Sequence, residues 1–116
     1  MEILFQSTRD CKLFSAQKEL VRTFGESVAK RVMQRLYELA AASSLLEISH
    51  LPPPRCHQLT NVIQPTYSVD VSPRLRLLFT PTLPIPLSED GSVDRARVFS
   101  ITIVEVRDTH EGKVRR

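Results

Sequence analysis

The stretch from Tyr67 to Phe79 constrains the fold more than any other part of the chain, because its apolar and polar side chains alternate with a period of two. This alternation is typical of a half-buried strand. Ser72-Pro73 indicates a turn in its middle, since proline has no backbone N–H to donate and fixes its own φ. The stretch therefore predicts two strands joined by a turn, each with one buried side. The residues expected on that side are Tyr67, Val69 and Val71 in the first strand and Leu75, Leu77 and Phe79 in the second.

Two arginines, Arg74 and Arg76, alternate with the apolar residues of the second strand. Because the period is two, both are expected on the side of the sheet opposite to the core. Guanidinium groups fixed on a rigid sheet are suited to binding an anion. Charged residues on an open sheet face are also common without any function, so this stretch alone leaves both interpretations open.

The composition is that of one soluble globular domain covering residues 1–116, since 41% of the residues are hydrophobic and 25% are charged. No segment approaches the ~20 apolar residues of a membrane-spanning helix. The N-terminus lacks the basic region of a signal peptide, so we expect a cytoplasmic protein without a membrane partner. The net charge of +3 gives a mild preference for polyanions, and it suits an acidic protein partner equally well.

A strand and two helices are predicted before the sheet. Glu2–Gln6 alternates like a strand, and Ser7 is a suitable N-cap for a helix from about Arg9 to Phe24. Gly25 ends that helix, as glycine often does at this position. A second helix is predicted from about Glu26 to Ala42, antiparallel to the first because the connection is short. Its basic residues lie off the apolar stripe and are expected in solvent: Lys30, Arg31 and Arg35.

The remaining segments predict the rest of the sheet. Pro52-Pro53-Pro54 favours an extended connector from the helices to the sheet, and Arg55–Leu59 re-enters a strand. The three prolines of Pro81–Pro86 exclude a central strand and indicate a long loop. Val98–Val106 is the most β-prone segment and is expected to be the central strand. This order predicts an α+β fold with an N-terminal strand, a two-helix hairpin, and a mostly antiparallel sheet of three or four strands that carries the helices on one face.

Several charged groups from three predicted strands or strand ends could meet on the open face of that sheet: His57, the Arg74/Arg76 pair, Asp108 and His110. The histidines are not spaced as metal ligands and there is no glycine-rich phosphate loop, so we expect no metal and no cofactor. Metal-independent cleavage of RNA needs a base for the 2′-OH, a cation for the phosphate and an acid for the leaving oxygen. Histidine and arginine can supply these roles near neutral pH.

Several short motifs stand in an order that is typical of one protein family. They are S-T-R-D-C-K-L-F at Ser7–Phe14, F-G-E-S-V-A-K at Phe24–Lys30, L-P-P-P-R-C-H-Q-L at Leu51–Leu59, R-L-R-L-L-F at Arg74–Phe79 and E-V-R-D-T-H at Glu105–His110. With these motifs the chain resembles the plasmid-maintenance killer proteins, the HigB-like branch of the RelE/ParE toxin superfamily. The resemblance implies a RelE-like fold and a compact ribonuclease that cuts mRNA, often on the ribosome, and is silenced by a small helix-turn-helix antitoxin.

The resemblance also assigns roles to residues. His57 matches the family histidine that follows the second helix, and Arg76 matches the arginine that holds the phosphate. Asp108 and His110 match the first and third residues of a C-terminal aspartate-tyrosine-histidine motif and are expected to transfer protons. Thr109 stands where that motif usually has an aromatic residue, and threonine cannot stack on a base. The residues expected to contact the RNA are Arg55, Arg74 and Thr109.

The predicted function is therefore that of an mRNA endoribonuclease, the toxin of a type II toxin–antitoxin system. Two alternatives stay open. ParE-like proteins of the same superfamily bind DNA gyrase and are not nucleases, and they tend to lack the histidine and arginine set. A catalytically weak module that only binds an antitoxin is also consistent with the sequence.

Overall fold

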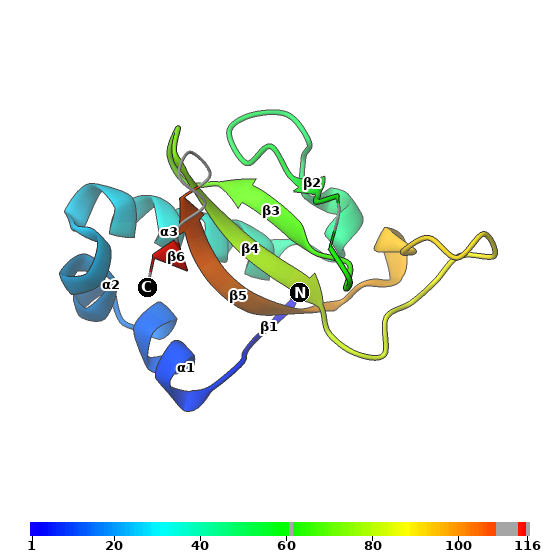
Figure 1. Cartoon of the computed structure of the whole chain (residues 1–116), viewed down its shortest axis with the longest axis horizontal. Coiled ribbons are helices and arrows are strands. Elements are labelled where there is room, and N and C mark those ends of the chain that lie inside the picture. Colours follow the sequence, from blue (N-terminus) through cyan, green and yellow to red (C-terminus); the bar gives the residue numbers. More distant parts are fainter. Residues whose placement is uncertain (61, 109–113, 116) are drawn as a thin grey trace.

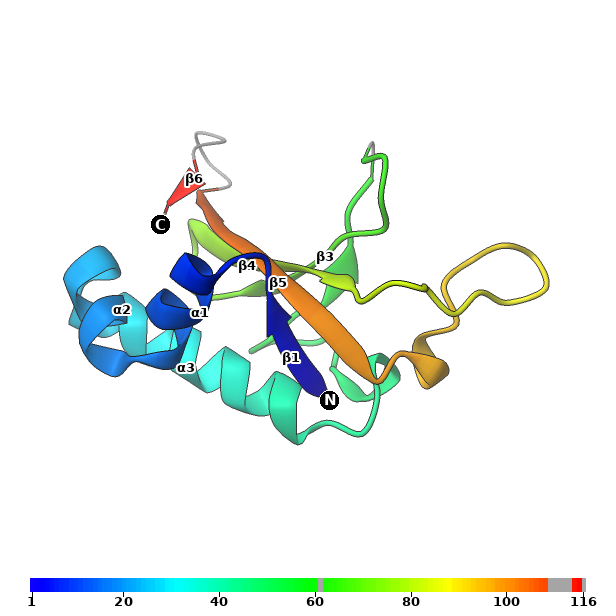
Figure 2. The ribbon, with the colours of Figure 1, turned by 90° about the horizontal axis from the view of Figure 1, so that it is seen from below.

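The computed structural model describes residues 1–60, 62–108 and the backbone of 114–115. Within these residues three α-helices lie against one face of a mixed β-sheet, which confirms the α+β class (Figures 1 and 2). No helix in this part of the chain is long and apolar enough to span a membrane. The elements in chain order are β1 (Glu2–Phe5), α1 (Thr8–Ser15), α2 (Gln17–Phe24), α3 (Glu26–Ala41), the 3₁₀ turn η1 (Leu45–Glu47), β2 (His57–Gln58), β3 (Tyr67–Asp70), β4 (Leu75–Pro81), the 3₁₀ turn η2 (Arg95–Arg97), β5 (Ser100–Asp108) and β6 (Val114–Arg115).

The strands are hydrogen-bonded in the order β1-β5-β4-β3-β2, and β6 also pairs with β5. β1 runs parallel to β5, and the other pairings are antiparallel. The strand predicted from Val98 is β5, which begins at Ser100. It lies inside the sheet between β1 and β4. A mostly antiparallel sheet is therefore confirmed, but in the described part of the chain it has six strands instead of the three or four expected, because β2 and β6 add short strands to it.

The helix predicted from Arg9 to Phe24 is in fact two helices, so that part of the prediction is wrong. Ser7 caps α1 as predicted, because its side chain accepts a backbone hydrogen bond of 3.0 Å. The chain becomes extended at Ala16 (φ −124°, ψ 118°) and then restarts as α2. α1 packs beside β1, where the Phe5 and Phe14 rings stack at 5.9 Å, whereas α2 packs against α3. The two halves thus have different packing partners, and no glycine or proline marks the break in the sequence.

Gly25 separates α2 from α3, as predicted. Its φ of +86° lies in the region that only glycine adopts without strain. Its N–H donates to the Val21 carbonyl (2.8 Å), which closes the last turn of α2 before α3 begins. The two helices consequently form the predicted hairpin (Figure 1).

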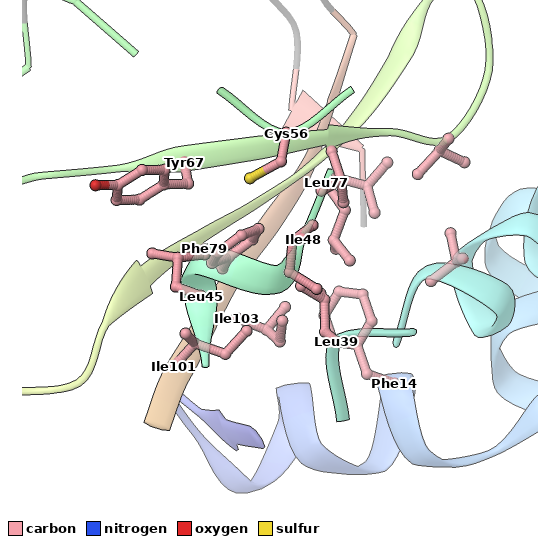
Figure 3. Close-up of a cluster of buried hydrophobic side chains, with 14 of the residues drawn as sticks. Phe14, Leu39, Leu45, Ile48, Cys56, Tyr67, Leu77, Phe79, Ile101 and Ile103 are labelled. Atoms are coloured by element: carbon pink, nitrogen blue, oxygen red, sulfur yellow. The ribbon is translucent and has the colours of Figure 1, made fainter. Parts of the chain in front are cut away.

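The hydrophobic core lies between the helices and the sheet (Figure 3). Leu39 of α3 and Leu45 of η1 face Phe79, Ile101 and Ile103 from the two longest strands. All five side chains are at most 1% exposed. Removing apolar surface from water in this way stabilises a fold by about 25 cal/mol per Å². The face of the sheet that the helices cover is thereby fixed, and with it the residues that point the other way.

The proline connector before β2 turns instead of running extended. The Arg55 N–H donates to the Leu51 carbonyl (3.1 Å), and the Pro52–Pro53 peptide bond is cis. Arg55 itself has a φ of +47°, which is uncommon for a residue other than glycine. At the end of β3 the Asp70 N–H donates to the Pro54 carbonyl (2.8 Å). The connector therefore folds back along β3 and brings Arg55 next to it.

Replacing Phe79 by Ala tests the position of the core. We expect this change to lower the free energy of unfolding by about 3–5 kcal/mol, since the ring is fully buried and its removal leaves a cavity. The matched control is Phe99→Ala, whose ring is 60% exposed and should cost far less. Urea denaturation followed by circular dichroism measures both, and equal losses would contradict the described core.

Candidate functional site

One side of the sheet carries polar residues of β3, β4 and β5, and no α-helix of the described residues packs on it (Figure 2). Because side chains alternate along a strand, Arg76 points to this side while Leu75 and Leu77 pack on the core. This side of the sheet is not fully exposed to solvent, since the side chains of Ser68 and Leu78 on it are buried. We call this surface the polar face and define it by Ser68, Asp70, Arg76, Leu78, Thr80, Thr102 and Arg107.

The register of the sheet places His57 beside Arg76 on the polar face. His57 pairs with Ser68 across β2 and β3, and Asp70 pairs with Arg76 across β3 and β4. These two rows are neighbours, so Nη1 of Arg76 lies 3.4 Å from Nε2 of His57. The structure thus brings together one histidine and one arginine of the predicted site.

The hydrogen bonds of His57 determine which ring nitrogen carries the proton. Nδ1 lies 3.2 Å from the Arg55 carbonyl oxygen, which can only accept, so Nδ1 is the protonated nitrogen. The guanidinium of Arg76 can only donate, so Nε2 must be the acceptor. The Ser68 hydroxyl, 3.5 Å from Nε2, can donate to it as well. His57 therefore presents a lone pair on Nε2 next to a fixed positive charge.

Asp70 positions the arginines around His57. Its carboxylate accepts hydrogen bonds from Nε (2.7 Å) and Nη2 (3.0 Å) of Arg55 in a bidentate pair. The same carboxylate lies 3.6 Å from Nε of Arg76. The hydrogen bond to Asp70 raises the pKa of Arg55, so this guanidinium stays charged. Arg55, predicted to contact RNA, is thus engaged by a carboxylate, although 39% of its side chain is exposed.

The prediction that Arg35 lies in solvent is wrong, because its side chain is only 8% exposed. Its Nε donates to the Asp70 carbonyl (2.7 Å) and its Nη2 to the Pro53 carbonyl (3.3 Å). Nη1 pairs with the Glu38 carboxylate at 3.0 Å. A buried guanidinium is tolerated because these partners satisfy its donors. Arg35 therefore fastens the end of β3 and the proline connector to α3.

Arg107 lies directly opposite Arg76 across β4 and β5. Like charges in this arrangement repel each other. A carboxylate lies near each guanidinium, since Arg76 shares Asp70 with Arg55 and Arg107 forms an ion pair with Glu105. The polar face therefore presents two neighbouring guanidinium groups that are partly neutralised, an arrangement able to bind an anion.

Arg74 and Asp108 do not share the polar face, contrary to the expectation from alternation. Arg74 precedes β4 in the turn, so the period of the strand does not apply to it. Its Nη2 lies 3.2 Å from Oδ2 of Asp108, which is 1% exposed and pairs with the core-facing Leu75. Both residues line a cavity on the helix side together with Phe24 and Val28. This ion pair is separate from the His57 cluster.

Thr109 and His110 lie outside the described residues, and their roles stay predictions. Three residues of the polar face, Asp70, Ser68 and Arg107, are not among the site residues predicted from the sequence. The sequence does contain a pattern that could have identified Asp70. This residue alternates with the buried residues of β3, and a tight turn at 71–74 aligns it with Arg76. Arg107 has a weaker signal, since its register depends on an irregularity of the β4–β5 pairing between Leu78 and Phe79 that no sequence pattern marks.

Cys56 is not an activated nucleophile even though it precedes His57. Its side chain points into the core, and burial raises the pKa of the thiol to about 11, with the charge of Arg95 acting weakly in the other direction. Among the described residues, no three His, Cys, Asp or Glu side chains are grouped as metal ligands. The chemistry available on the polar face is therefore that of an imidazole, guanidinium groups and carboxylates.

Comparisons of the chain with protein-family models, with curated proteins and with solved structures find no match.

Replacing Arg35 by Met tests its buried role. The change leaves the Asp70 and Pro53 carbonyls without their donor, so we expect the free energy of unfolding to fall by about 1–3 kcal/mol. Arg31→Met on the exposed side of the same helix is the matched control and should change little. Urea denaturation compares the two variants, and an Arg35→Met protein as stable as the control would refute the described contacts.

The two cysteines should differ in reactivity toward a thiol reagent such as DTNB. At pH 8 only about 0.1% of Cys56 is thiolate if its pKa is about 11, and the side chain is buried as well, whereas Cys11 is exposed. We expect one rapidly reacting thiol in the folded chain and two after denaturation. Cys11→Ser should remove the rapid phase, and a rapid phase that persists in this variant would contradict the burial of Cys56.

Proposed function

We propose that this chain is a metal-independent endoribonuclease that cuts mRNA and acts as the toxin of a type II toxin–antitoxin pair. The observation that carries the proposal is the contact between His57 and Arg76, in which Nε2, the acceptor nitrogen inferred from the ring's partners, lies 3.4 Å from a guanidinium nitrogen. A base beside a cation is what attack of a ribose 2′-OH on its own phosphate requires. The resemblance to HigB-like toxins adds mRNA, free or on the ribosome, as the substrate and a small antitoxin as the partner.

The reaction begins with proton removal at His57. Nε2 accepts the proton of the 2′-OH, and the resulting oxygen forms a bond to the adjacent phosphorus. The bond from phosphorus to the 5′-oxygen then breaks. The products are a 2′,3′-cyclic phosphate on one fragment and a 5′-OH on the other. A protonated Nε2 remains next to Arg76 and is returned to its starting state by loss of the proton to water.

Arg76 would stabilise the negative charge that grows on the phosphate oxygens during attack. Its guanidinium is planar and is held from one side by Asp70, so its orientation is set before the substrate arrives. Arg107, opposite Arg76, adds a second cation on the same face. Asp70 and Arg55 act as positioning residues, because they hold Arg76 and the His57 ring rather than the substrate.

The leaving 5′-oxygen needs a proton. His110, the predicted donor, lies outside the described residues, and its role is part of the proposal only through the family resemblance. Asp108 is left out of the mechanism, because its carboxylate is buried on the helix side and is engaged by Arg74.

Replacing His57 or Arg76 by Ala should each lower the rate of RNA cleavage about 100-fold or more. The matched control is Arg22→Ala, which removes a 64% exposed guanidinium of α2, away from the polar face. Cleavage of a purified RNA is followed in EDTA, and the 3′ ends are tested for the cyclic phosphate. A substrate with 2′-deoxyribose at the cut position should be resistant. Loss of activity in EDTA, or cleavage of the deoxy substrate, would reject the mechanism.

Pulse labelling after induction separates the proposal from the gyrase alternative. We expect protein synthesis to stop first, with fragmented mRNA, because the substrate is the message. Arrest of DNA synthesis with intact mRNA would instead assign the chain to the gyrase-binding class. Unaffected growth with a stably folded chain would leave only the antitoxin-binding module.

A further inference from the structure

The polar face continues beyond the His57 cluster into a hollow of about 570 Å³. Its floor includes Thr80 and Thr102, which lie opposite each other on β4 and β5. The connection from β2 to β3 rises on the side of the sheet away from the helices and forms one wall (Figure 2). The residues that line the hollow are Gln6, Val62, Ile63, Gln64, Thr66, Thr80, Pro81, Thr82, Leu83, Thr102 and Val104.

The chemistry of this hollow differs from that of the His57 cluster. None of the described residues that line it is charged. The walls are aliphatic, and Ile63 and Leu83 stand exposed at the rim, Leu83 being 70% exposed. The polar groups are hydroxyls and two side-chain amides, Gln6 and Gln64. A phosphate or any other ion would find no countercharge here, whereas a flat, uncharged group with polar edges fits both the walls and the floor.

Hydroxyl groups on the floor and beside it are linked by hydrogen bonds. Ser100 donates to Thr82 (2.9 Å), and Thr82 lies 3.0 Å from Thr102. Either hydroxyl of the Thr82–Thr102 pair can be the donor, and the Thr102 hydroxyl can still take part in a further hydrogen bond. Hydrogen bonds in such a chain strengthen one another. The floor therefore offers a hydroxyl held in place by its neighbours, which can bond to the donor or acceptor atoms on the edge of a nucleobase.

We propose that this hollow binds an unpaired nucleobase of the RNA substrate, which rests on the proposed ribonuclease function of the neighbouring cluster. Thr80 lies four residues from Arg76 along β4, a separation of about 13 Å. A short stretch of single-stranded RNA spans that distance, so a phosphate at Arg76 and a base at Thr102 belong to one strand. The Watson–Crick edge of such a base is free for hydrogen bonds only when the base is unpaired.

Direct binding tests the proposal without any cleavage. The ¹⁵N-labelled full chain is titrated with adenosine and with uridine, and with ribose 5-phosphate as a ligand that has no base. We expect a nucleoside to shift the amide signals of Thr80, Thr102 and Val104, and ribose 5-phosphate to leave them in place. Thr102→Val keeps the shape of the side chain and removes its hydroxyl, so it should weaken nucleoside binding about five-fold. The control Thr23→Val, on α2, should bind like the parent protein.

A cleavage assay then tests the base pocket separately from the proposed ribonuclease activity. On a pool of random RNA, Thr102→Val should change the base preference next to the cut, whereas Thr23→Val should not. No nucleoside shift together with an unchanged preference would overturn the base pocket while leaving the nuclease proposal in place. Nucleoside shifts in a chain that cuts no RNA would support the pocket and reject the nuclease. Equal shifts with ribose 5-phosphate would overturn recognition of the base.

Discussion

The arrangement of charged groups on the polar face depends on the contacts of the Asp70 carboxylate. The carboxylate holds Arg55 with two hydrogen bonds and lies beside Arg76, so two guanidinium groups take their positions from one acceptor. Its backbone is fixed as well, because its N–H donates to Pro54 and its carbonyl accepts from Arg35. Side chain and backbone of one residue therefore connect β3, the proline connector and α3. The groups proposed for catalysis need such support, since small displacements reduce the effect of a catalytic group strongly.

Arg35 shows that this support has an energetic cost. A guanidinium transferred from water to a site with 8% exposure loses most of its hydration, and the hydrogen bonds to its partners have to offset that loss. Only a group with several donors, however, can bond the carbonyls of Pro53 and Asp70 together. The buried arginine therefore fixes the geometry of the connector that carries Arg55 and His57, and its removal would leave both carbonyls without their donor.

Much of the fold follows from periodicity, and much of the site does not. The alternation in β3 and β4 identifies the buried face, and the helical period with Gly25 identifies α3, because both patterns depend on local geometry alone. The break at Ala16 depends on which elements the two helix halves pack against, and this is information from distant residues. Arg35 was expected off the apolar stripe, but it follows Val32 by three residues and lies on the buried side of α3. Arg74 was misplaced because strand alternation was extended into a turn.

The polar face divides into a charged part and an uncharged part, and this division favours a single nucleic-acid strand over a protein as its occupant. A strand presents charged phosphates and uncharged bases at regular intervals, which matches guanidinium groups near His57 and hydroxyls near Thr102. In a duplex the base edges are paired and could not enter the hollow. A protein partner could cover the exposed aliphatic rim. In the proposed reaction, the acceptor nitrogen of His57 removes a proton next to the phosphate that Arg76 would bind.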